Sequence, residues 1–89
     1  MRYTSDEIAL IDGVIATLFP RMADRSLRDA YQSVYRHLEA GAVGTEDLRR
    51  IANALEFADP GQCVSFHKEE YRDFTALKVK TQAMLREVS

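Results

Sequence analysis

Three side chains near the start of the last predicted helix are of types that bind metal ions or transfer protons. Cys63, His67 and Glu70 are spaced at i, i+4 and i+7, which places them on one face of a helix. A thiolate, an imidazole and a carboxylate can bind zinc or act in acid–base catalysis. A zinc site needs three or four ligands, but Cys63 precedes the predicted helix and the only other histidine, His37, belongs to an earlier one. We therefore expect no metal site, and interpret the three side chains as a polar break in an apolar helix face.

Large apolar residues surround this polar break and predict a contact surface. Phe66, Tyr71 and Phe74 lie in the same predicted helix as His67 and Glu70. We expect these five residues to contact a protein partner or a second copy of the chain. The sequence contains no nucleophile elbow, phosphate-binding loop or paired catalytic carboxylates, so we expect no enzyme, no cofactor and no small-molecule substrate.

The last helix, predicted over residues 65–88, is longer than the helices before it. At 1.5 Å per residue it would reach about 35 Å, whereas residues 27–40 and 46–58 would each form a helix of roughly 20 Å. One end of the last helix then projects past its support. We expect a partner chain to cover that end, with a homodimer through this helix as the simplest arrangement.

A helical hairpin is predicted at the centre of the chain. Apolar residues at i, i+3, i+4, i+7, i+8 and i+11 define one face of the first arm: Leu27, Ala30, Tyr31, Val34, Tyr35 and Leu38. Gly41 can take the left-handed conformation that closes this arm. The connection of about four residues makes the arms antiparallel neighbours. We interpret Tyr31 and Tyr35 as residues at the edge of the core with hydroxyl groups that reach water.

Capping residues set the expected starts of the two arms. Ser26 and Asp29 resemble a capping box for the first arm, and Asp24 is an alternative cap. Thr45 is the expected N-cap of the second arm. The two acidic residues after Thr45 place negative charge at the positive end of the helix dipole.

The first segment carries two conflicting signals. Asp12-Gly13 between apolar runs is typical of a β-hairpin. Thr4 and Glu7 form a capping box, however, and a helical apolar stripe continues through the Asp-Gly pair. We predict a helix over residues 5–19, in which Gly13 costs about 1 kcal/mol relative to alanine. Asp12 lies at the rim of the stripe and is interpreted as a solvated boundary residue.

The composition is that of a single globular domain. The chain has 89 residues, of which 46% are hydrophobic and 29% charged, and its formal net charge is -2. This balance creates no global field for nucleic acid or an anionic membrane. The short apolar runs, the absence of a basic leader and the single cysteine favour a cytoplasmic protein. The excess of Arg over Lys favours a GC-rich bacterial genome. We expect an all-α bundle of four main helices over residues 1–89.

Part of the second arm resembles a known DNA-binding family. Residues 48–57 are similar to the "L-x-x-I-A-x-A-L" helix that follows the recognition helix in phage-repressor-like helix-turn-helix proteins. The resemblance covers ten of the 89 residues and implies a nucleic-acid-binding or transcription-associated regulator. Glu46 and Asp47 at the start of this arm would repel phosphates where bases are usually read. We therefore expect a non-catalytic protein-interaction or self-association module first, and the regulator as the alternative.

Overall fold

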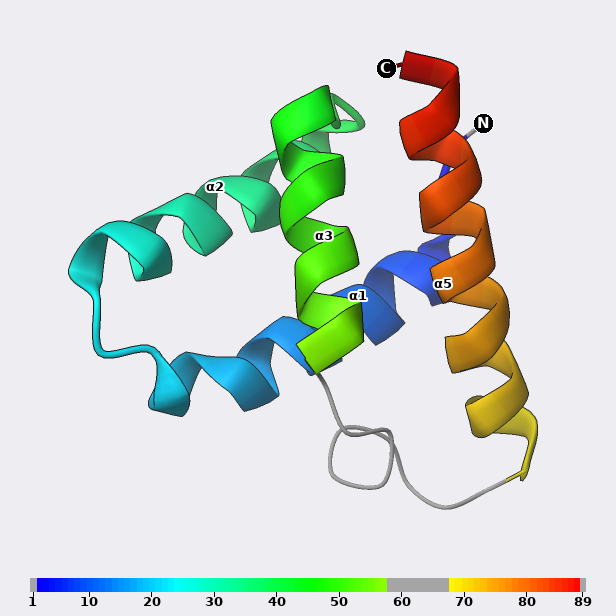
Figure 1. The fold of residues 1–89 in the computed structure, drawn as a ribbon, viewed down its shortest axis with the longest axis horizontal. Coiled ribbons are helices and arrows are strands. Elements are labelled where there is room, and N and C mark those ends of the chain that lie inside the picture. Colours follow the sequence, from blue (N-terminus) through cyan, green and yellow to red (C-terminus); the bar gives the residue numbers. More distant parts are fainter. Residues whose placement is uncertain (1, 58–67, 89) are drawn as a thin grey trace.

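The computed structural model describes residues 2–57 and 68–88, and these form an all-α bundle (Figure 1). No strand is present among these residues, as predicted. The observed elements are α1 (Ser5–Leu18), the short 3-10 helix η1 (Phe19–Arg21), α2 (Arg25–Ala40), α3 (Thr45–Phe57) and α5 (Lys68–Val88). The predicted ends of two helices, at residues 58 and 65, lie outside the described residues.

Helix α1 runs unbroken through Asp12-Gly13, so the helical prediction is confirmed and the hairpin alternative is wrong. The capping box at its start is complete: Thr4 Oγ1 accepts the Glu7 N–H at 3.2 Å, and Glu7 Oε1 accepts the Thr4 N–H at 2.7 Å. Gly13 does not have the positive φ that a type I′ hairpin turn would require. Pro20 follows in η1, where a residue without an N–H can end the helix.

The first arm of the predicted hairpin, α2, begins and ends at caps that the sequence contains. Asp24 is the N-cap, and its Oδ1 accepts the Ser26 N–H at 2.8 Å. The capping box proposed for Ser26 and Asp29 is wrong, because Ser26 already lies inside the helix. Gly41 closes α2 with φ 69° and ψ 23°, the predicted left-handed conformation.

The second arm, α3, begins at Thr45, the residue that was predicted to be its N-cap. The Gly44 carbonyl accepts the Leu48 N–H at 3.1 Å, so Gly44 is the N-cap and Thr45 is the first helical residue. Gly44 has no side chain with which to cap the helix. Instead, Asp47 Oδ2 accepts the Gly44 N–H at 2.9 Å from inside the first turn. The predicted Thr45 cap is therefore wrong, while acidic residues do occupy the start of the helix.

Helix α3 lies at the centre of the bundle and packs against α1, α2 and α5, most extensively against α5. Figure 1 shows α2 crossing α3 at a steep angle, so the two arms splay apart from their turn. Side chains from all four long helices form the core, the largest of which are Phe74, Ile11, Ile15, Ile51, Leu55 and Leu77. The predicted hairpin is therefore present at the centre of the bundle, with α3 as its buried arm, but its arms splay apart instead of lying closely side by side.

Helix α5 is the longest element, with 21 residues against 13 in α3. Figure 1 shows it continuing past the end of α3. Its buried face includes Phe74, Leu77, Thr81 and Met84. Within the two described ranges, no helix is both long and apolar enough to cross a membrane.

Candidate functional site

An open groove lies at the end of the bundle where α2 turns into α3. Its volume is about 490 Å³. The walls come from the segment before α1, from the end of α2 with its turn, and from α5. The lining residues are Arg2, Tyr3, Ile8, Leu38, Glu39, Ala40, Gly41, Val43 and Met84.

The floor of the groove is apolar and continuous with the core. Leu38 and Met84 are buried, with exposed fractions of 2% and 7%. Ile8 and Val43 are partly buried and pack against the core cluster. An apolar group placed in the groove would therefore extend the core rather than cover an isolated patch.

One wall of the groove is held in place by α5 through a set of contacts that we call the N-terminal clamp. Lys80 Nζ donates hydrogen bonds to the Arg2 carbonyl and to Glu7 Oε1, both at 2.6 Å. The hydroxyl groups of Tyr3 and Thr81 are 2.7 Å apart and share a hydrogen bond. The clamp thus joins residues 2–7 to α5 across almost the whole length of the chain.

Burial and hydrogen bonds shift the pKa values of two clamp residues, Glu7 and Tyr3. Burial raises the pKa of Glu7, but the hydrogen bonds from Lys80 and at Thr4 outweigh it, so this pKa lies below its ordinary value. Burial also raises the pKa of Tyr3, more than the bond to Thr81 lowers it. At neutral pH the clamp therefore holds a carboxylate–ammonium pair and a neutral phenol.

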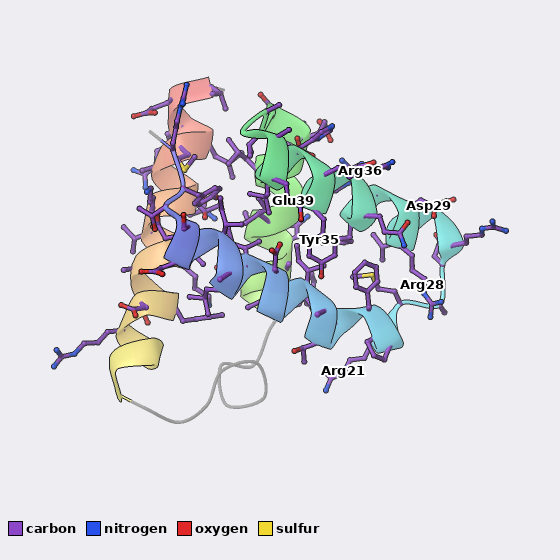
Figure 2. The ribbon with its side chains drawn as sticks, turned by 180° about the vertical axis from the view of Figure 1, so that it is seen from behind. Arg21, Arg28, Asp29, Tyr35, Arg36 and Glu39 are labelled. Atoms are coloured by element: carbon purple, nitrogen blue, oxygen red, sulfur yellow. The ribbon has the colours of Figure 1, made fainter. Side chains whose placement is uncertain are left out.

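The opposite wall of the groove carries the acidic side chain of Glu39. Asp12 does not line the groove but lies near enough to interact with Glu39. Glu39 projects from α2, and Figure 2 shows it with Tyr35 on the side of α2 that faces α1. Asp12 lies one turn beyond Ile8 on α1; its Oδ1 is buried and has no hydrogen-bond partner among the described residues. Burial raises the pKa of Asp12, and the negative charge of Glu39 raises it further. Asp12 is therefore half-buried at the boundary of the core, as interpreted, but one of its carboxylate oxygens is not solvated.

The two tyrosines of α2 bind neighbouring helices. The Tyr31 hydroxyl donates to the Arg50 carbonyl on α3 at 3.1 Å, and the Tyr35 hydroxyl donates to the Asp12 carbonyl on α1 at 3.1 Å. The Phe19 ring stacks on Tyr35 with 5.7 Å between centroids. The two tyrosines belong to the core or its edge, as predicted, and their hydroxyl groups bind backbone carbonyls of α3 and α1.

A histidine and a carboxylate fix the turn that ends the groove. His37 Nδ1 lies 2.8 Å from Asp47 Oδ2, the same oxygen that accepts the Gly44 N–H. Asp47 is only 5% exposed. No hydrogen bond from a serine, threonine or cysteine to this pair is found in the described part of the chain, so the geometry is that of a structural lock on the turn.

Of the residues predicted to form an interaction surface, only Phe74 has a described side chain, and it does not line the groove. Phe66 and His67 lie outside the described residues, as does Cys63. Glu70 and Tyr71 belong to α5, but the structure describes nothing of their side chains. Phe74 is 1% exposed in the core, so it stabilises the fold and cannot contact a partner. Among the described residues, no group of three or more metal-binding side chains is present.

Sequence reasoning did not identify the groove because its lining comes from four separate segments. Glu39 and Ala40 are ordinary residues on the polar side of an amphipathic helix, and Arg2 precedes the first helix. The only available signal is the capping box at Thr4, which fixes the direction in which the first residues enter α1. Comparison with models of protein families, with curated proteins and with solved structures finds no match for this chain.

Proposed function

We propose that this chain is a non-catalytic helical interaction module that binds a segment of another protein in the groove. The observation that carries the proposal is an open apolar floor, continuous with the core, between walls of opposite charge. Its volume of about 490 Å³ falls within the roughly 300–1,000 Å³ typical of binding sites. Apolar side chains that enter it are favoured by roughly 25 cal/mol for each Å² removed from water.

The chemistry of the lining favours binding over catalysis. Its ionisable side chains are Arg2, Tyr3 and Glu39. The Tyr3 hydroxyl is hydrogen-bonded to Thr81 instead of to a base that could activate it as a nucleophile. The groove is also open to solvent, whereas catalytic sites usually exclude water.

The proposal moves the expected contact surface from the start of α5 to its second half. Met84, near the end of α5, lies in the groove floor, while Phe74 is occupied by packing within the core. Helix α5 therefore retains a role in binding, because it supplies both a floor residue and the clamp that holds one wall.

A substitution that fills the groove tests this function. Ala40 lines the groove and is exposed at the last turn of α2, where an arginine is favourable for the helix dipole. We expect peptides selected from a randomised display library on the wild-type protein to lose at least tenfold in affinity for Ala40→Arg.

Ala42 provides the matched control for this experiment. It is exposed two residues away and does not line the groove, so Ala42→Arg adds the same charge and volume outside it. The affinity of the selected peptides for Ala42→Arg should stay within about twofold of their affinity for wild type. Failure to enrich any peptide, or equal binding by wild type and Ala40→Arg, would reject the proposed function.

A further inference from the structure

The side chains around the groove have a definite charge arrangement. Arg2 stands on the wall formed by the N-terminal segment, and Glu39 stands on the wall formed by α2. Neither side chain forms an ion pair with another described residue, whereas Glu7 and Lys80 pair with each other. Among the described lining residues, the groove therefore offers the cation of Arg2 on one wall and the anion of Glu39 on the other, with apolar residues between them.

A second acidic residue, Asp12, adds to the negative charge near Glu39 without lining the groove itself. Asp12 is close enough to Glu39 for the two negative charges to repel each other, and its buried Oδ1 has no donor among the described residues. The nearby Tyr35 hydroxyl does not supply a donor to this oxygen, because it donates to the backbone carbonyl of Asp12. A bound ammonium or guanidinium group beside Glu39 would reduce the repulsion and offer hydrogen-bond donors to this wall.

From this arrangement we propose that the occupant of the groove is an amphipathic segment of a different protein, in which an apolar anchor lies between a basic and an acidic residue. The anchor contacts Leu38, Val43 and Met84. The basic residue faces Glu39, and the acidic residue faces Arg2. The inference rests on the proposed function. It adds to that function the residue types of the partner segment and the direction in which the segment lies in the groove.

A display library tests the charge arrangement directly. Each peptide carries a fixed central leucine, methionine or phenylalanine with randomised flanks, and selection is run in parallel on wild type, Glu39→Lys and Arg2→Glu. Wild type should enrich peptides with Lys or Arg on one side of the anchor and Asp or Glu on the other. Glu39→Lys should enrich an acidic residue at the position where wild type enriches a basic one. Arg2→Glu should enrich a basic residue at the position where wild type enriches an acidic one, and should leave the preference on the other side of the anchor unchanged.

One selected peptide then serves for a quantitative test. Its affinity should fall about two- to fivefold on Glu39→Lys, as for an exposed ion pair, and return when the facing basic residue of the peptide is changed to glutamate. Glu56→Lys is the matched control, because Glu56 is exposed on α3 and does not line the groove. Raising the salt concentration to about 0.5 M should shrink the effect of Glu39→Lys.

Different failures have different meanings. Selected peptides that keep the anchor but show no charge preference, or the same preference on all three proteins, would overturn this inference and leave the proposed function standing. Loss of peptide selection altogether would overturn both. Sedimentation equilibrium of the protein alone should show a monomer; a dimer that Ala40→Arg dissociates would mean that a second copy occupies the groove, which would also overturn the inference.

Discussion

Lys80 on α5 and Glu7 on α1 form an ion pair with 2.6 Å between Nζ and Oε1, and the side chain of each is only 23% exposed. The same Nζ binds the Arg2 carbonyl and lies 5.8 Å from the centre of the Tyr3 ring. One ammonium group thus holds the segment that forms a wall of the groove. The stability of the fold and the shape of the groove are therefore linked at Lys80.

Replacing Lys80 should loosen this wall. We expect Lys80→Met to lower the free energy of unfolding by about 1 kcal/mol, because a partly buried charged hydrogen bond is lost while the apolar stem is kept. Amide hydrogen exchange of residues 2–7 should increase, and urea unfolding gives the stability. Lys78→Met is the control, since Lys78 contacts only the Phe74 ring among the described interactions. Equal effects of the two substitutions would argue against the clamp.

The ion pair also predicts how stability depends on pH. Because the folded pKa of Glu7 lies below its ordinary value near 4.5, its stabilising contribution is complete above that pH and is lost as the pH falls through the folded pKa. Glu7→Gln should therefore be less stable than wild type at pH 7, and the gap should narrow below about pH 4.5. A gap that stays constant down to pH 2.5 would contradict this assignment.

Ionisation of Asp12 should lower the stability of the fold, whereas ionisation of Glu7 raises it. Its folded pKa is raised above the ordinary 3.8, so the unfolded chain ionises first as the pH rises, and the folded state is progressively destabilised. We expect Asp12→Asn to be more stable than wild type at pH 7 by up to about 1 kcal/mol. The gain should vanish below the ordinary pKa, which urea unfolding at pH 3 would measure. A loss of stability at pH 7 would show that the carboxylate has a favourable partner.

The Tyr3–Thr81 hydrogen bond can be isolated by a double-mutant cycle. Thr81 is fully buried, and Thr81→Val keeps its shape while leaving the Tyr3 hydroxyl without its partner. We expect Thr81→Val to cost about 1 kcal/mol, and Tyr3→Phe combined with it to cost less than the sum of the single substitutions. Strictly additive free energies of unfolding would mean that the two hydroxyl groups do not interact.

Two glycines should respond to alanine in opposite ways. Gly13 lies in a helix with open space where a Cβ would be, so Gly13→Ala should stabilise the protein by about 0.5–1 kcal/mol. Gly41 has φ +69°, so Gly41→Ala should destabilise it by roughly 1 kcal/mol. Thermal unfolding by circular dichroism measures both. A destabilising Gly13→Ala would indicate that something packs against this exposed face of α1 in solution.

Local signals predicted the helices well, while the site depends on long-range contacts. Gly41 and the Thr4–Glu7 box act within a few residues, so spacing alone was enough to locate the helix ends they form. Thr45 was misassigned as a cap because Gly44 accepts the first helical bond and Asp47 reaches back to it. The hydroxyl group of Tyr35 could be placed only once the crossing of α2 over α1 was known. No periodicity in the sequence relates Arg2 to Glu39 or Met84.

The Tyr3–Thr81 contact joins residues 78 positions apart in a chain of 89. Closing a loop of this length carries an entropic cost, which the packing of the helices between the two residues must offset. The groove, which is lined by both ends of the chain, thus depends on this long-range contact. A ligand bound there would stabilise the whole domain against unfolding, by an amount that grows with the logarithm of ligand concentration.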